Sequence, residues 1–113
     1  MKNPLEMALD VYKELGIKAD IGYIYILKAE NGLYKIGKSK DPGSRIASIR
    51  TSSPVVLEVY RVFQSTEYSK QEKILHRLFE DLRELGEWFR LTDEELATID
   101  EIQGDHTLLP CYL

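Results

Sequence analysis

Polar and apolar residues alternate in short stretches along the chain, and three of these stretches predict strands. Residues 21–28 and 33–38 are rich in β-branched and aromatic side chains, and a turn is expected between them at 29–32. Residues 55–64 have the same character, and a shorter extended piece is expected at 87–91. We therefore expect a small antiparallel sheet of about three strands.

Apolar residues recur at helical spacing in further stretches, bounded by residues that favour helix ends. These helices are expected at 3–16 with Asn3 as the N-cap, at 41–51, at 66–85, and at 92–102 with Thr92 as the N-cap. The longest carries an apolar stripe made of Ile74, Leu75, Leu78, Phe79, Leu82 and Leu85. The order of elements indicates an α+β fold in which helices flank the sheet.

The chain has 113 residues, enough for one domain with one hydrophobic core. We expect an accessory helix at 1–20, the main domain at 21–103 and a tail at 104–113. The composition, 43% hydrophobic and 30% charged, is that of a folded protein. No apolar stretch approaches the ~20 residues that span a bilayer, and 1–10 lacks the features of a signal peptide. The single cysteine, Cys111, has no partner in the chain, which favours a reducing cytoplasmic setting.

The net charge of −4 is unevenly distributed along the sequence. Residues 28–50 hold six basic side chains against two acidic ones, whereas residues 66–113 hold twelve acidic against five basic. A basic region on an acidic molecule can attract a phosphate backbone, because charges act mainly within a Debye length of about 8–10 Å. Two solvated faces of opposite sign would give the same pattern, so charge alone leaves both readings open.

The two strands of the hairpin and the helix after them carry a distinctive set of polar residues. The first strand reads Gly-Tyr-Ile-Tyr-Ile-Leu at 22–27, and the second reads Tyr-Lys-Ile-Gly-Lys at 34–38. This region resembles the GIY-YIG nuclease superfamily, in which an Ile-Tyr strand and a Tyr-Ile-Gly strand precede an arginine on the next helix. Tyr25 matches the first tyrosine, Lys35 takes the place of the second, and Arg45 falls at the arginine position.

The resemblance extends over about 22–91. Glu72 matches the glutamate that the superfamily carries on a later helix, and Gly-Glu-Trp-Phe at 86–89 is similar to a phage and bacterial branch with lysine in place of the second tyrosine. Two positions depart from the pattern. Tyr23 stands where the first glycine would be, and no asparagine matches the one found near the end of many of these domains.

The resemblance implies a metal-dependent endonuclease that hydrolyses phosphodiester bonds, in DNA rather than RNA. Tyr25 would be the general base, and Glu72 would hold Mg²⁺ or Mn²⁺. The phosphate and the phenolate would be stabilised by Lys35, Lys38 and Arg45. A tyrosine has an ordinary pKa of about 10 and needs nearby cations to become a base. Mg²⁺ typically takes one or two carboxylates, and arginine clasps phosphate with paired donors.

Further contacts to the nucleic acid are expected from Lys38, Lys40, Arg50 and His76. Because the chain has no separate DNA-binding domain, a homodimer or a protein partner would supply the rest of the affinity. The alternative is a catalytically weak or inactive module that keeps the fold and binds nucleic acid or a protein. Each residue also has a plainer interpretation: Tyr25 as a packing aromatic, and Glu72 and His76 as part of a solvated helix face.

The length of the hairpin loop decides whether Tyr25 and Lys35 share a face of the sheet. A two-residue Asn31-Gly32 turn would place them on opposite faces, because side chains alternate along a strand. A three-residue loop with Gly32 left-handed would pair position 29 with 33, set Gly37 opposite Tyr25, and bring Lys35 to the same face. We expect the three-residue loop because it places Tyr25 and Lys35 on one face. This arrangement would also explain Gly37, as a residue that leaves room beside the tyrosine ring for a phosphate.

Overall fold

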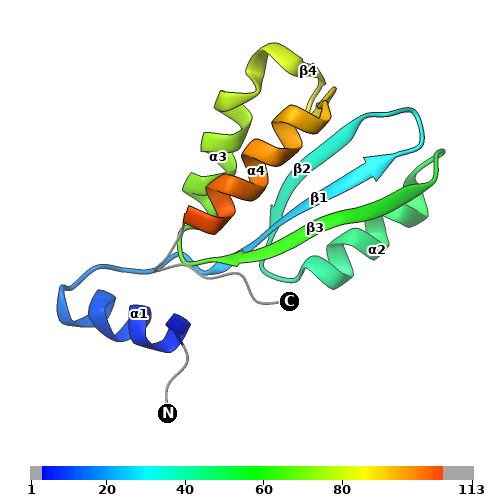
Figure 1. The fold of residues 1–113 in the computed structure, drawn as a ribbon. Helices are drawn as coiled ribbons and strands as arrows, with labels where there is room; N and C mark the ends of the chain where they lie inside the picture. The colour runs from blue at the N-terminus through cyan, green and yellow to red at the C-terminus, as the bar shows by residue number, and fades with distance from the viewer. Residues whose placement is uncertain (1–3, 106–113) are drawn as a thin grey trace.

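The computed structural model describes residues 4–105, and within them it shows an α+β fold with a five-stranded antiparallel sheet (Figure 1). The helices are α1 (Pro4–Glu14), α2 (Pro42–Ser52), α3 (Tyr68–Leu78) and α4 (Asp93–Asp105), with a short 3₁₀ helix at Glu80–Leu82. The strands are β1 (Gly22–Ala29), β2 (Tyr34–Ser39), β3 (Leu57–Ser65), β4 (Arg83–Leu85) and β5 (Trp88–Phe89). They are arranged in the order β3-β1-β2-β5-β4. The expected cap Asn3, and Cys111 in the expected tail, lie outside the described residues.

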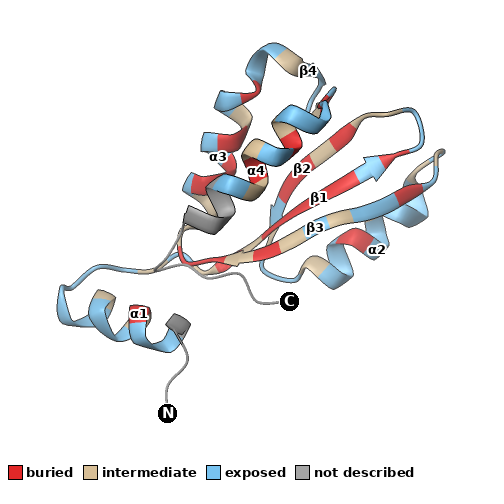
Figure 2. Cartoon of the chain, viewed as in Figure 1, coloured by how far each residue is buried: buried red, intermediate tan, exposed pale blue. Residues whose placement is uncertain are grey.

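The sheet is covered on both faces (Figure 1). On one face, α3 and α4 enclose a core made of Ile24, Ile26, Tyr34, Ile36, Phe63, Leu75, Phe79, Phe89, Leu91, Leu96 and Ile99. On the other face, α2 covers a smaller core made of Tyr25, Leu27, Ala29, Ile46 and Leu57. Side chains of β1 therefore alternate between two buried environments, which explains why its central residues are nearly all buried (Figure 2). The α+β class with an N-terminal helix is confirmed.

The hairpin between β1 and β2 has the expected three-residue loop. The amide of Ala29 donates to the carbonyl of Leu33 at 2.8 Å, and Gly32 has a φ of +87°, in the left-handed region that favours glycine. Tyr25 lies opposite Gly37, and Leu27 lies opposite Lys35. The predicted register is thus confirmed, and Tyr25 and Lys35 belong to the same face of the sheet.

The expected helix at 66–85 is wrong in its second half. Helix α3 ends at Leu78, and the chain then forms the 3₁₀ turn and the hairpin of β4 and β5. The reason is pairing with the sheet: Trp88 and Phe89 add to the edge of β2, and the chain must turn back to reach it. The amide of Arg90 donates to the carbonyl of Leu82 at 2.9 Å and closes this turn. The sheet consequently has five strands rather than the expected three or so.

The buried face of α3 also differs from the predicted stripe. Ile74 and Leu78 are exposed, at 58% and 52%, whereas Leu75 and Phe79 are buried in the core as expected. The buried face instead continues toward the N-terminus through Gln71 and Glu72. Helix α3 is therefore rotated so that Glu72 joins Leu75 on the buried face, in place of Ile74 and Leu78.

Strand β3 contains a bulge opposite the middle of β1. Ile26 pairs with Arg61 and Leu27 pairs with Val59, so Tyr60 is an extra residue. Because of this insertion, Tyr60 and Arg61 can both contribute on the face covered by α3 and α4. Tyr60 packs against that core, and Arg61 Nε donates to Asp100 Oδ1 of α4 at 3.3 Å.

Helix α1 lies apart from the sheet (Figure 1). Its link to the rest of the fold includes a 3.2 Å hydrogen bond between the hydroxyls of Tyr12 and Thr66, and Gly16 ends it with a φ of +69°. Met7 and Val11 are exposed, at 57% and 50%. Within the described residues, no helix is both long enough and apolar enough to cross a membrane.

Candidate active site

Tyr25 is held in a fixed position by its cross-strand partner. Its side chain is 1% exposed, and its ring lies over Gly37 of β2. A Cβ atom at position 37 would overlap Cζ and the hydroxyl of Tyr25 and would lie 2.8 Å from its Cε1. The glycine is therefore needed because the phenol occupies the space that any other side chain would fill.

Arg45 lies beside the phenol on the α2 face. Helix α2 begins with Asp41, whose side chain accepts a hydrogen bond from the amide of Ser44 at 3.3 Å, and with Pro42 in its first turn. This start places Arg45 in the next turn, adjacent to the buried anchor Ile46. The sequence therefore fixes the distance from the hairpin to the guanidinium through a capped helix start.

The pKa of Tyr25 is raised above its ordinary value of 10.0, mainly by burial. Hydrogen bonding to Arg45 and the charge of its guanidinium act in the opposite direction, while the carboxylates of Glu87 and Glu72 raise the pKa further. From the sequence we expected the cations Lys35, Lys38 and Arg45 to lower this pKa. Arg45 does so, but burial and the two carboxylates outweigh it, so the phenol is neutral at pH 7.

Lys35 reaches round the edge of the sheet from the face of Tyr25. Its ammonium lies 3.0 Å from Glu87 Oε1 and 5.4 Å from the centre of the Trp88 ring. Its side chain is 13% exposed, whereas that of Glu87 is 38% exposed, so the ion pair is shielded from water mainly on the lysine side. The backbone carbonyl of Glu87 also accepts from the amide of Ile36 at 3.1 Å, which fixes the loop that carries this carboxylate.

Glu72 is the buried acid of the site. It is 8% exposed, and its Oε2 atom is buried without a hydrogen-bond partner among the residues that the structure describes. Burial raises its pKa, and Glu87 raises it further, while His76, Lys38 and Lys35 lower it. A buried oxygen with no donor is costly unless something else binds it. The plainer interpretation, a solvated helix face, does not describe this residue.

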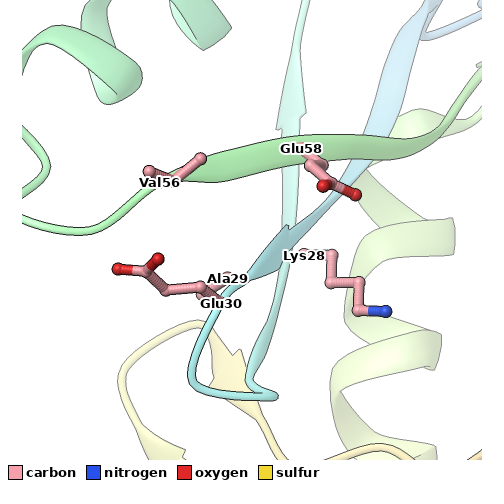
Figure 3. A pocket seen from close by; sticks show the side chains of 5 residues that line it. All are labelled: Lys28, Ala29, Glu30, Val56 and Glu58. Atoms are coloured by element: carbon pink, nitrogen blue, oxygen red, sulfur yellow. The ribbon is translucent and has the colours of Figure 1, made fainter.

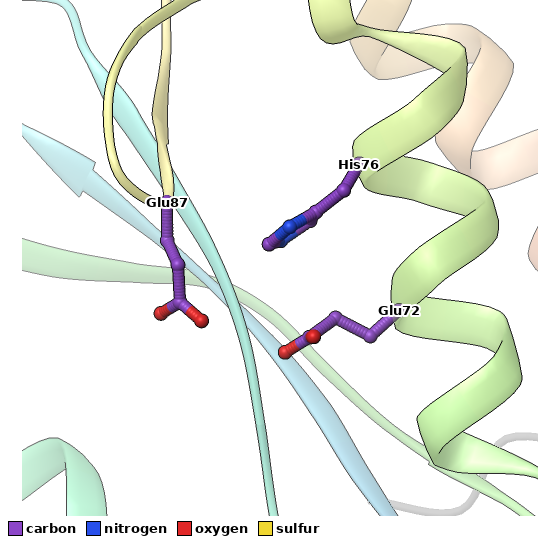
Figure 4. Close-up of side chains that lie close together, drawn as sticks. All are labelled: Glu72, His76 and Glu87. Atoms are coloured by element: carbon purple, nitrogen blue, oxygen red, sulfur yellow. The ribbon is translucent and has the colours of Figure 1, made fainter.

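Glu72, His76 and Glu87 form a group that could hold a metal ion (Figure 4). Each offers one ligand atom, and these atoms all lie within 4.8 Å of one another. The chemistry of the set, two carboxylates and one imidazole, suits a divalent cation. The unpartnered Oε2 of Glu72 is an independent sign that a cation fits here.

Tyr25 and Glu72 approach each other from opposite faces of the sheet. Tyr25 packs with Ile46 of α2, whereas α3, which carries Glu72, covers the other face. The charge of Glu72 contributes to the raised pKa of Tyr25, so the two groups lie within electrostatic range. At β2 the Lys35–Glu87 ion pair connects the two sides, since Lys35 shares the face of Tyr25 and Glu87 lies with Glu72 and His76. The room expected beside the tyrosine ring at Gly37 is occupied by the phenol itself. The candidate site therefore lies at the edge of β2 and involves both faces of the sheet.

The other residues expected to bind nucleic acid are spread around this edge and beyond it. Lys38 lies opposite Ile24, on the face of α3, with its ammonium 5.6 Å from the centre of the Tyr68 ring. Lys40 is exposed in the connection to α2. Arg50 Nε donates to the carbonyl of Leu57 at 3.2 Å. That contact ties α2 to β3 near Ala29, four residues and about 13 Å along β1 from Tyr25.

A separate hollow of about 220 Å³ lies at the far end of the sheet, beside the β1–β2 turn (Figure 3). It is lined by Lys28, Ala29, Glu30, Val56 and Glu58. The residues of the candidate active site do not line this hollow.

Glu87 is the residue whose place in the site was least evident from sequence. It lies in the Gly-Glu-Trp-Phe stretch, and Gly86 before it has a φ of +56°. The glycine turn between β4 and β5 brings Glu87 toward α3 (Figure 4), and this turn was not predicted because residues 83–85, which form β4, were expected to be the end of a helix. A glycine followed by an acid and two aromatic residues was the available signal.

A family model matches the part of the chain that carries the candidate site. The model of the T5orf172 domain family matches residues 22–103, and this family is related to GIY-YIG-like domains. No curated protein and no solved structure gives a significant match. The family match spans the sheet, helices α2 and α3, and most of α4, and it includes every residue of the site at the edge of β2. The chain belongs to the T5orf172 domain family.

Proposed function

We propose that the protein is a metal-dependent endonuclease that hydrolyses phosphodiester bonds in DNA. The observation that carries this proposal is the buried carboxylate of Glu72, whose Oε2 has no hydrogen-bond partner among the described residues and whose charge acts on Tyr25, itself hydrogen-bonded to Arg45. The relation of the T5orf172 family to GIY-YIG-like domains supports the same reaction class. The basic stretch 28–50, which contributes β2 and α2, supports an anionic substrate.

The residues of the site have complementary roles in this reaction. Arg45, exposed on α2, binds a non-bridging oxygen of the scissile phosphate with paired donors. In its phenolate form, the minor form at neutral pH, Tyr25 takes the proton from the attacking water as the water oxygen bonds to phosphorus and the P–O bond to the leaving group breaks. Lys35 stabilises the negative charge that develops on the phosphoryl oxygens.

Glu72 is the residue that holds the divalent cation. The cation, when bound, supplies Lewis-acid stabilisation of the phosphoryl oxygens and lowers the pKa of a bound water. Lys38 and Lys40, which follow Gly37, extend the positive surface along the path of the DNA backbone. A homodimer or a protein partner would add further contacts to the DNA.

The test is cleavage of plasmid and linear DNA in the presence of Mg²⁺ or Mn²⁺, with matched RNA substrates. Glu72→Gln and Arg45→Ala are expected to lower the cleavage rate by at least about a hundredfold, as loss of charge stabilisation in a transition state typically does. Glu80→Gln and Arg77→Ala remove the same charges from an exposed pair between the end of α3 and the following 3₁₀ helix, and they should leave the rate unchanged.

The role of Tyr25 has its own readout. Because its pKa lies above 10, the phenolate fraction rises about tenfold per pH unit across the neutral range, and the cleavage rate should rise in parallel. A flat profile would make Tyr25 a positioning donor rather than the base. Cleavage by Glu72→Gln at the wild-type rate would show that Glu72 does not hold the metal. Salt-sensitive DNA binding without cleavage in the presence of any metal would indicate a binding module rather than a nuclease.

A further inference from the structure

Two residues beyond Glu72 face the position where a cation would bind. Glu72 and His76 are four residues apart on α3, so their side chains extend from the same face of the helix. Glu87 approaches from the loop before β5 (Figure 4). The three ligand atoms lie within 4.8 Å of one another. Ligands on opposite sides of one transition-metal ion lie about 4.2 Å apart, so only a small closing movement separates this arrangement from a coordinated one.

The burial of Glu72 shows that the cluster is more than a group of surface acids. Its side chain is more than nine-tenths buried, and one oxygen has no donor among the described residues. Surface carboxylates avoid this cost by contacting water, but a buried one needs a partner. The side chain extends from α3 toward the space shared with His76 and Glu87 (Figure 4).

His76 is oriented as a metal-binding histidine usually is. Its Nε2 atom lies 2.8 Å from the carbonyl oxygen of Ile36, which can only accept a hydrogen bond. Nε2 therefore carries the proton, and in the neutral ring Nδ1 keeps its lone pair. A hydrogen bond from the other ring nitrogen to a backbone carbonyl is the common way in which proteins fix the tautomer of a metal ligand. The Phe89 ring, 5.1 Å from the imidazole centre, limits the ring's movement further.

Glu87 is already placed and partly neutralised by Lys35. The ammonium lies 3.0 Å from Oε1, so Oε2 is the oxygen free of this ion pair. A carboxylate shared between a lysine and a cation is held on one side and can bind on the other. The same lysine extends from the face of Tyr25, so it connects the proposed cation position with the face on which Tyr25 and Arg45 would contact the phosphate.

We infer that Glu72, His76 and Glu87 together bind one divalent transition-metal ion, and that His76 makes the site prefer Mn²⁺ over Mg²⁺. Imidazole nitrogen is a good ligand for first-row transition metals, whereas Mg²⁺ prefers oxygen and water. The inference rests on the proposed function for the role of the ion, but the binding itself is measurable without DNA. Beyond the proposed function, the inference names His76 and Glu87 as further ligands of the ion and predicts which metal is preferred.

The test is calorimetric titration of the metal-free protein with Mn²⁺ and, separately, with Mg²⁺. Wild-type protein should bind one Mn²⁺ at least about tenfold more tightly than Mg²⁺. His76→Gln places an amide where Nε2 was and lacks the second ring nitrogen, so it should weaken Mn²⁺ binding by about tenfold or more and abolish most of the preference. Glu87→Gln should weaken the binding of both ions. Glu58→Gln, an isosteric change on β3 beside the separate hollow, is the matched control and should change neither.

A spectroscopic readout identifies the ligand directly. The chain has two histidines, His76 and His106, and His106→Asn assigns their imidazole signals in a proton NMR spectrum. Substoichiometric Mn²⁺ should broaden the His76 signals before those of His106. Equal broadening, or unchanged Mn²⁺ affinity in folded His76→Gln and Glu87→Gln proteins, would overturn the inference.

The two proposals fail separately. If DNA is cleaved but Mn²⁺ affinity is unchanged by substitution of His76 and Glu87, the nuclease proposal stands and the three-residue metal site is wrong. If Mn²⁺ binds saturably and this binding depends on all three residues, but no DNA is cleaved, the metal site stands and the nuclease proposal is wrong.

Discussion

Replacing Gly37 by alanine is expected to destabilise the protein and to displace the phenol of Tyr25. The new Cβ would overlap Cζ and the hydroxyl of Tyr25 and would lie 2.8 Å from Cε1. The ring is 1% exposed, so it has little room to move without pushing on its neighbours or separating β1 from β2. Added atoms in a packed core typically cost about 1–3 kcal/mol.

One effect works in the opposite direction. Alanine has less backbone freedom than glycine in the unfolded chain, which favours the folded state by about 0.5–1 kcal/mol at an ordinary strand position. The overlap outweighs this gain, and the net loss in the free energy of unfolding is about 1–2 kcal/mol. For a domain of this size, such a loss lowers the melting temperature by roughly 10 °C.

The assay is thermal and urea unfolding of wild type, Gly37→Ala and the control Gly43→Ala. At Gly43, on helix α2, the nearest atom to an added Cβ is Asp41 Oδ1 at 3.8 Å, an ordinary contact. The control should therefore be as stable as wild type or slightly more so. Tyr25→Phe in the Gly37→Ala background removes one overlapping atom and should recover part of the loss. A Gly37→Ala protein that melts at or above the wild-type temperature would refute the packing argument.

Three further changes test other parts of the structure. Glu72→Gln should stabilise the metal-free protein at neutral pH by about 1 kcal/mol, because a buried charge is removed. Since the folded-state pKa of Glu72 is raised, wild type should lose stability relative to Glu72→Gln as pH rises above the ordinary value of 4.5, and urea unfolding of both proteins from pH 4 to 8 measures this difference. Glu95→Ala should lower the melting temperature by removing the carboxylate that accepts from the amide and hydroxyl of Thr92; because the pKa of Glu95 is lowered, the difference from wild type should be present at neutral pH and vanish as the pH falls through that value. Gly22→Ala would place a Cβ 2.5 Å from Cδ2 of Tyr68 and should cost about 1–2 kcal/mol in urea unfolding, with recovery in Gly22→Ala/Tyr68→Ala.

The hairpin and the start of α2 were predictable from sequence because local chemistry determines them. The odd-length loop followed from the need to place Tyr25 and Lys35 on one face, and the structure has Tyr25 opposite Gly37. Asp41 followed by Pro42 is a strong helix-start signal, and it fixes the position of Arg45. In these places a few neighbouring residues decide the backbone geometry.

The region after Leu78 was not predictable in the same way. Leu82 and Leu85 continue a helical spacing, so periodicity favoured a longer helix, but pairing of Trp88 and Phe89 with β2 overrides it. Leu85 is 77% exposed and contributes nothing to the expected stripe. The position of Glu87 depends on this turn, so the third acidic or imidazole group of the site could not be placed from the sequence. The pKa of Tyr25 likewise depends on burial, which the motif does not encode.

The extra residue in β3 has a consequence for how copies of this protein meet one another. Strand β3 is nine residues long and forms the outer edge of the sheet, and such an edge is a template on which a neighbouring molecule can add a strand. The insertion at Tyr60 interrupts the regular ladder and increases the local twist, while the charged Glu58 and Arg61 lie on either side of it. An uninterrupted run of main-chain hydrogen bonds between two molecules is thereby disfavoured. Deleting one residue here would straighten the edge and promote polymerisation of the folded protein.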